Sequence, residues 1–226
     1  MERVISFSIY GQYPKYTVGL LRNLELSKQI YRGWVVYIYY NNTVPSYIID
    51  EYKKFDNVKL FDMTNIDIPG MFWRFTPQEN VERFISRDAD SRLSHRERYA
   101  VDDWIESNKT LHILRDHPHH EHEVNGGMFG LKITNRFNML SEIQKWLVGK
   151  SLAVDNKFGD LDFLDNVMFP SLKDDLIAHD SVWKNRPGSV PFPTPMEDWK
   201  FVGEIYDEND NRYPQYREWI GRKEIR

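Results

Sequence analysis

The chain contains no cysteine among its 226 residues. A disulfide framework and thiolate chemistry are therefore excluded. No apolar run approaches the roughly 18 to 20 residues of a membrane-spanning helix, and the first eleven residues, MERVISFSIYG, are too polar for a signal peptide. We expect a soluble protein of a reducing compartment, with no membrane span.

Clustered positive charge is also lacking. The net charge is −4 and no polybasic tract occurs, which argues against a protein that binds DNA or RNA. Aromatic residues, by contrast, are abundant at 15%, with seven Trp and thirteen Tyr. Such a surplus suits a hydrophobic core and also a cleft that stacks on bases and sugars.

The first sixty residues alternate between strand and helix patterns. Strand patterns occupy 3–9, 34–40 and 58–61, with helical patterns at 15–31 and 46–55 between them. This order predicts a parallel sheet with crossover helices, a Rossmann-like half. No G-x-G-x-x-G or Walker pattern follows these strands, which argues against dinucleotide dehydrogenases and P-loop enzymes.

The ligand side of such a sheet lies beyond the carboxyl ends of its strands. The first strand ends with Ser8 near its last residue, and Tyr10 and Gly11 follow it. Residues 39–42 lie at the end of the second strand. We therefore expect these residues to face a ligand.

A fourth strand pattern, 81–87, runs directly into Asp88, Ala89 and Asp90. In an extended chain residues i and i+2 point to one side, so the two carboxylates converge. Paired hard oxygen donors suit Mg²⁺ or Mn²⁺ carrying a phosphate, whereas a polar loop after a strand is the alternative without metal. Arg87 can pair with these carboxylates or meet a polyanion.

The capping box Ser94-His95-Arg96-Glu97 predicts the start of a helix just after this acidic triplet. Further on, we expect a strand at 109–114, a helix at 135–147, a strand at 175–178, an extended segment at 187–195, a last strand at 201–206 and a terminal helix at 216–222. The length and the absence of a dividing linker fit one domain.

Two segments between these elements have alternative interpretations. The aromatic segment 69–75 is either a loop packed on the core or a lid over a ligand. Four histidines lie within 117–122, where Pro118 prevents a helix and the spacing matches no H-E-x-x-H zinc site. We expect a polar loop there, whose histidines contact either a substrate or solvent.

Later positions also allow both a structural and a functional interpretation. Gly126 and Gly127 precede an apolar strand and indicate either a hairpin turn or close approach to a ligand. Asp160 and Asp162 fall in the first turn of a helix predicted from 158, where acids favour the helix dipole; a general base is the functional alternative. His179 at a strand end is either structural or a third metal ligand.

The order of these motifs resembles that of compact GT-A nucleotide-sugar glycosyltransferases, the small polysaccharide glycosyltransferases of bacterial clusters and large algal viruses. The likeness spans nearly the whole chain. One departure is that relatives read Asp-Gln before Phe-Leu where this chain has Asp160-Leu161. The residues that carry the resemblance are Asn23, Trp73-Arg74-Phe75, Arg87-Asp88-Ala89-Asp90-Ser91, Arg115-Asp116-His117-Pro118, Gly126-Gly127-Met128-Phe129-Gly130, Asp160 with Phe163-Leu164, His179-Asp180-Ser181 and Phe201-Val202-Gly203.

The resemblance implies an α/β fold of GT-A type in a single domain. Residues 1–92 would form a Rossmann-like nucleotide-binding half, and 93–226 a mixed-sheet half for the sugar and the acceptor. The implied activity is transfer of a hexose or deoxyhexose from a nucleoside-diphosphate sugar, with UDP as the nucleotide, to a glycan or other hydroxyl acceptor. The implied location is the cytoplasm, or the host cytoplasm for a viral protein.

The resemblance also implies roles for individual residues. The base would lie near Ser8, Tyr10 and Gly11, and the ribose near Asp88. Further implied contacts are Asp88, Asp90 and His179 to Mn²⁺ or Mg²⁺, Arg74 or Arg87 to the diphosphate, and Gly126, Gly127 and Met128 to the donor sugar.

The stereochemical course stays open at this stage. An inverting enzyme needs a carboxylate to deprotonate the acceptor, with Asp160 or Asp162 as candidates, whereas in a retaining enzyme the leaving phosphate can take that proton. A metal-dependent phosphohydrolase or nucleotidyltransferase using the same carboxylates is the main alternative function. A non-catalytic carbohydrate-binding module is a second.

Overall fold

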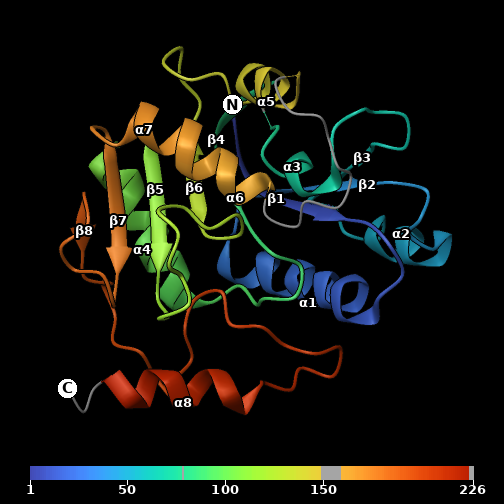
Figure 1. Cartoon of the computed structure of the whole chain (residues 1–226). Helices are drawn as coiled ribbons and strands as arrows, with labels where there is room; N and C mark the ends of the chain where they lie inside the picture. The colour runs from blue at the N-terminus through green and yellow to red at the C-terminus, as the bar shows by residue number, and fades with distance from the viewer. Residues whose placement is uncertain (78, 149–158, 224–226) are drawn as a thin grey trace.

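A computed structural model describes residues 1–77, 79–148 and 159–223 (Figure 1). Eight strands within these residues form one sheet in the order β3-β2-β1-β4-β6-β5-β7-β8. The strands are β1 (Glu2–Ile9), β2 (Val35–Tyr40), β3 (Val58–Asp62), β4 (Val81–Ser86), β5 (Leu111–Arg115), β6 (Phe129–Lys132), β7 (Leu176–Asp180) and β8 (Ser189–Val190).

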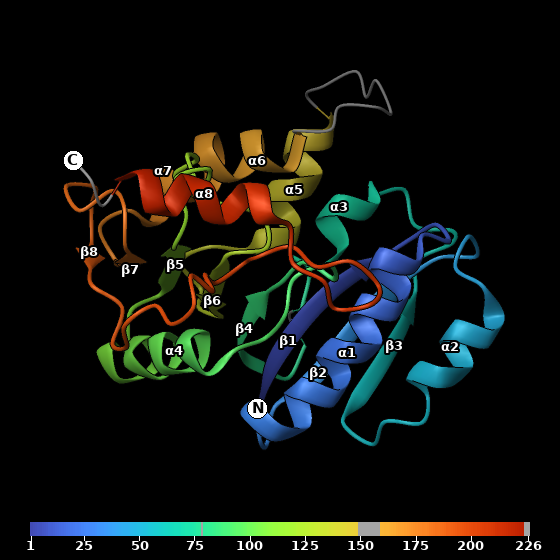
Figure 2. The same cartoon turned by 90° about the horizontal axis from the view of Figure 1, so that it is seen from below.

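Helices cover both faces of this sheet (Figure 2). One apolar cluster joins the sheet to α1, α2 and α4, and a second joins its other face to α3, α5, α6 and α7. No helix among the described residues is long and apolar enough to cross a membrane. The helices are α1 (Pro14–Ile30), α2 (Ser46–Tyr52), α3 (Gly70–Trp73), α4 (His95–Ser107), α5 (Met139–Val148), α6 (Gly159–Phe163), a π-helical turn (Leu164–Met168), α7 (Phe169–Leu172) and α8 (Pro214–Lys223).

The predicted fold class is confirmed. Strand β1 pairs in parallel with β2 and β4, and β2 in parallel with β3, as the alternating pattern required. The sheet becomes mixed at β6, which lies antiparallel between β4 and β5. Because β1, β4 and β5 run in the same direction, their carboxyl ends meet at one edge of the sheet, near α8 (Figure 1).

Some predicted elements are wrong. Segment 201–206 forms no strand in the part of the chain that the structure describes; Tyr206 makes an isolated bridge with Arg212, and its N–H donates to the carbonyl oxygen of Asp90 at 2.8 Å. The proline-rich segment contains the short strand β8, which pairs with β7. The predicted helix from 158 begins, within the described residues, at Gly159.

The aromatic segment 69–75 packs on the core. It contains the short helix α3, and Phe72, Trp73 and Phe75 are buried in the cluster on that face of the sheet. The Trp73 ring also meets the Tyr10 ring edge-on at 5.9 Å. This packing fixes Arg74, at the end of α3, beside the carboxyl end of β1.

Candidate active site

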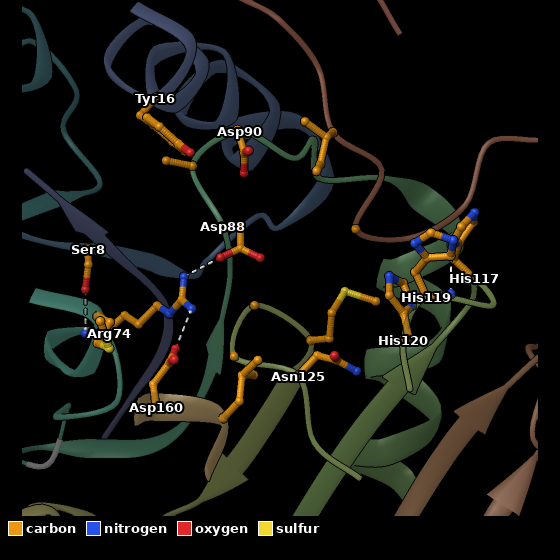
Figure 3. A pocket seen from close by; sticks show the side chains of 18 of the residues that line it. Ser8, Tyr16, Arg74, Asp88, Asp90, His117, His119, His120, Asn125 and Asp160 are labelled. Atoms are coloured by element: carbon orange, nitrogen blue, oxygen red, sulfur yellow. Dashed lines mark hydrogen bonds and ion pairs between the residues drawn. The ribbon is translucent and has the colours of Figure 1, made fainter. Parts of the chain in front are cut away.

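A cavity of about 620 Å³ opens at the carboxyl ends of β1, β4 and β5 (Figure 3). Its walls come from segments far apart in sequence, which the parallel strands bring together. It holds most of the residues that the sequence marked as candidates. Those that line it are Ser8, Tyr10, Arg74, Asp88, Asp90, Gly126, Gly127, Met128 and Asp160.

The loop carrying Asp88 and Asp90 is fixed by the helices on either side of it. Asn23 of α1 donates from Nδ2 to the carbonyl oxygen of Ser91 at 2.8 Å. The predicted cap at Ser94 is confirmed, since its hydroxyl accepts from the Glu97 N–H at 3.2 Å. These contacts hold both carboxylates on the cavity wall.

Arg74 is the central cation of the site (Figure 3). Its Nη1 pairs with Asp88 Oδ1, and its Nη2 lies 3.5 Å from Asp160 Oδ2. Burial opposes its charge, but Asp88 and Asp160 raise its pKa overall. Its backbone N–H donates to the Ser8 hydroxyl at 2.9 Å. The Arg74 guanidinium therefore joins the Asp88 loop to α6, and its backbone N–H ties the same residue to β1.

The glycine pair makes room for these charged side chains. A Cβ on Gly127 would collide with the Asp88 carboxylate, and one on Gly126 would lie 2.9 Å from Asp160 Oδ2. The absence of side chains at these two positions thus accommodates Asp88, Arg74 and Asp160, and the predicted close approach to a ligand stays a prediction. A role for these glycines against a sugar stays a prediction.

Asp90 is bound from the outer side by Lys15, whose Nζ lies 2.8 Å from Oδ2. Burial and the nearby Asp88 raise the pKa of Asp90, and Lys15 opposes that shift. Burial likewise raises the pKa of Asp160.

Four predicted site residues do not line the cavity: Gly11, Arg87, Asp162 and His179. Arg87 is buried, and its Nε donates to Glu97 at 2.8 Å, because neighbouring residues of an extended chain point to opposite sides. The prediction that Arg87 meets the diphosphate therefore lacks support in the structure, whereas Arg74 lines the cavity.

His179 lies away from Asp88 and Asp90. Its Nδ1 is 2.9 Å from His112 Nε2, and its Nε2 is 2.9 Å from Asp103 Oδ2. Both ring nitrogens are thus engaged with other side chains. The structure does not bring His179 to the cavity as a third metal ligand.

Other lining residues were not assigned from the sequence. They include Tyr16 on α1, Asn125 before the glycine pair, and several residues of the C-terminal region. Residues 117–120 were recognised only as a polar loop with a possible substrate contact. Since β5 runs parallel to β4, the loop that follows β5 reaches the same edge of the sheet, and its residues His117, His119 and His120 line the cavity. The lining residues from the C-terminal region are Phe201, Gly203, Ile205 and Tyr216.

The donor set suits a divalent cation held jointly by protein and substrate. Asp88 and Asp90 face one cavity and supply hard oxygen atoms, and Mg²⁺ typically takes one or two carboxylates together with substrate phosphates. Among the described residues no group of three or more His, Cys, Asp or Glu side chains is arranged to hold a metal ion. The two carboxylates therefore fit a metal that a diphosphate helps to bind.

No protein-family model and no curated protein matches the chain significantly. Several solved structures do match it. The galactosyltransferase LgtC, solved in complex with donor and acceptor sugar analogues, aligns over 97% of this chain and 95% of its own, with a TM-score of 0.54 and 10% identity. An active-site mutant of LgtC gives the same coverage and a TM-score of 0.53. A glycosyltransferase involved in glycosylation of the major capsid of PBCV-1 aligns over 80% of this chain and 82% of its own, with 16% identity and a TM-score of 0.43.

The class that these observations define is an α/β protein with a mixed sheet of GT-A type. In particular, the chain has the fold of the galactosyltransferase LgtC over nearly its whole length.

Proposed function

We propose that this chain is a metal-dependent glycosyltransferase that moves a sugar from a nucleoside-diphosphate sugar, with UDP as the nucleotide, to a hydroxyl of a glycan acceptor. The observation that carries the proposal is the pair Asp88 and Asp90 on the wall of a cavity at the carboxyl edge of a GT-A-type sheet. In sheets of this kind ligands bind at that edge.

The donor would extend along the cavity from the end of β1. Tyr10, which packs on Trp73, offers a ring near the base, and Asp88 lies where the ribose or a metal would sit. Arg74 would give charge-assisted hydrogen bonds to the diphosphate, exchanging part of its pairing with Asp88 and Asp160. When bound by Asp88 and Asp90, Mn²⁺ or Mg²⁺ would neutralise charge on the departing diphosphate.

Asp160 is the better candidate for a general base because it lines the cavity and Asp162 does not. If transfer inverts the anomeric carbon, Asp160 would accept the proton of the acceptor hydroxyl. If transfer retains configuration, the leaving phosphate would take this proton and Asp160 would serve to hold Arg74. The anomeric configuration of the product, read by NMR, distinguishes these courses.

Calorimetry with UDP and Mn²⁺ tests the proposal. We expect binding that EDTA abolishes and that Asp90→Asn weakens at least about tenfold, because a charge-assisted contact contributes more than an ordinary hydrogen bond. The matched control is Asp102→Asn on the surface of α4, where the carboxylate pairs with Arg98 away from the cavity. UDP binding that persists unchanged in EDTA, or in Asp90→Asn, would contradict the proposal.

A further inference from the structure

His120 lies in the cavity wall with a defined hydrogen-bonding role for one ring nitrogen. The backbone N–H of Asp116 donates to His120 Nδ1 at 3.0 Å. Because Nδ1 is an acceptor, the neutral ring must carry its proton on Nε2. Burial and the neighbouring His117 ring lower the pKa of His120, which favours this neutral form.

The Nε2–H of His120 has no hydrogen-bond partner among the described residues, although the ring lines the cavity. Gly203, whose φ is +84°, lies on the same wall of the cavity. A Cβ on Gly203 would lie 2.5 Å from the Met128 sulfur and 3.5 Å from His120 Cε1. Gly203 thus avoids a clash with Met128, and the His120 ring lies at ordinary contact distance beside it.

Two nearby histidines, His117 and His122, do not offer the same donor. His117 accepts from the His119 N–H at Nδ1, and its Nε2 lies 2.9 Å from the carbonyl oxygen of Tyr216. His122 lies 2.7 Å from Asp165 and does not line the cavity. His120 thus differs from His117 and His122 in its hydrogen bonding.

Asn125 supplies a second polar group on the same wall. Its Nδ2 is buried and has no hydrogen-bond partner within the described residues, yet the side chain lines the cavity. A buried donor without a protein partner is costly, so this group on a cavity wall is available to a water molecule or to a ligand. In Figure 3, His120 and Asn125 lie on the side of the cavity away from Ser8.

We propose that His120 and Asn125 form a subsite that binds hydroxyl groups of a sugar, apart from the carboxylates that meet the diphosphate; this rests on the proposed function. Both groups are uncharged donors, which suit hydroxyl oxygens better than phosphate. The Phe201 ring, 6.0 Å from the His120 ring, adds an apolar surface beside them. The sugar is either the transferred sugar of the donor or the acceptor saccharide.

Two substitutions separate the structural from the binding role of His120. His120→Asn keeps an acceptor near the Nδ1 position for the Asp116 N–H and removes the Nε2–H donor. His120→Gln places an amide nitrogen near the Nε2 position and restores a donor. Asn125→Ala removes the second donor, and His122→Asn is the control outside the cavity.

The probes are UDP, a panel of UDP-sugars and a panel of free monosaccharide acceptors, each with Mn²⁺. We expect His120→Asn to bind UDP like the wild type and to lose about tenfold in affinity for the preferred UDP-sugar, the usual effect of one lost hydrogen bond. Asn125→Ala should act in the same direction, and His120→Gln should recover most of the loss. This result would place the transferred sugar in the subsite.

A subsite for the acceptor would give a different supporting result. UDP-sugar affinity and hydrolysis of the UDP-sugar by water would then stay unchanged, while the KM for the monosaccharide acceptor rises about tenfold. Equal weakening of UDP and UDP-sugar, or no change in either donor or acceptor binding, would overturn the subsite. A wild-type protein that does not bind UDP would overturn the proposed function instead.

Discussion

Asn23 on α1 and Ser91 after β4 are joined by a hydrogen bond of 2.8 Å, from the Asn23 amide to the Ser91 carbonyl oxygen. Asn23 Oδ1 also accepts from the Leu93 N–H at 3.0 Å. A Cβ on Gly19 would lie 2.6 Å from the Ala89 carbonyl oxygen, so helix and loop are in close contact. The first crossover helix thus holds the loop that carries the paired carboxylates.

Replacing Asn23 should affect both stability and nucleotide binding. We expect Asn23→Ala to lower the free energy of unfolding by about 1–3 kcal/mol, since it leaves buried backbone groups without partners. UDP affinity in the presence of Mn²⁺ should fall as the loop loosens. Urea denaturation and calorimetry measure the two effects. Asn23→Asp is the comparison, because it keeps the acceptor for Leu93; full stability in Asn23→Ala would contradict the assignment.

Arg87 should act on stability alone. Its side chain pairs with buried Glu97 and donates from Nη1 to the carbonyl oxygen of Phe129 at 3.0 Å. Breaking a buried ion pair by removing one partner costs about 3–5 kcal/mol, so Arg87→Met should be strongly destabilised in urea. Arg87→Lys keeps the charge and should lose less.

The folded Arg87→Lys protein should bind UDP with Mn²⁺ as tightly as the wild type, whereas Arg74→Lys should bind it more weakly. Calorimetry on both proteins, which keep a positive charge, makes this comparison. A selective loss of UDP affinity in Arg87→Lys would restore a direct role for that side chain at the diphosphate.

Local patterns predicted the parallel part of the sheet and the carboxylates that follow β4 on the cavity wall. The alternation of strand and helix patterns required parallel strands. Asp88 and Asp90 both line the cavity, although residues 89–90 form a turn and not the extended chain that the spacing argument assumed. The cap at Ser94 was equally readable because capping depends on residues within one helical turn. Each of these inferences needed only neighbours in sequence.

Tertiary neighbours could not be predicted in the same way. Arg87 adjoins Asp88 in sequence but points into the core, while Arg74, fourteen positions from Asp88, reaches its carboxylate through the packing of α3. Glu97 completes a capping motif, yet its carboxylate binds Arg87 and Tyr31. Which partner a charged side chain takes depends on which helices pack together, and periodicity does not encode this.

Gly127 offers a test of the space around Asp88. A Cβ there would occupy the position of the Asp88 carboxylate, so Gly127→Ala should displace Asp88 and reduce UDP affinity in the presence of Mn²⁺ by at least about tenfold. Gly159→Ala is the matched control, since among the described residues its Cβ would meet only the Met71 sulfur, at 4.0 Å. Calorimetry measures both variants. If Gly127→Ala and Gly159→Ala bound UDP equally well, the position of Asp88 would not matter for UDP binding.

Asp160 should make stability depend on pH in a direction opposite to that of an exposed carboxylate. Burial raises the pKa of Asp160 above 3.8, so the folded state holds this proton more tightly than the unfolded chain. Its contribution is then fully present below 3.8 and is lost as pH rises through the raised pKa. The stability of the wild type relative to Asp160→Asn should therefore fall as pH rises above 3.8 through the raised pKa.

The comparison for this slope is Asp62, whose pKa is lowered because its carboxylate accepts from the Thr64 hydroxyl and N–H. Its contribution is present above 3.8 and is lost as pH falls through the lowered pKa. The stability of the wild type relative to Asp62→Asn should thus rise with pH, and only near and below that value. Urea denaturation over a pH series measures both differences. If the stability of the wild type relative to Asp160→Asn rose with pH, Arg74 would lower the pKa of Asp160 more than burial raises it.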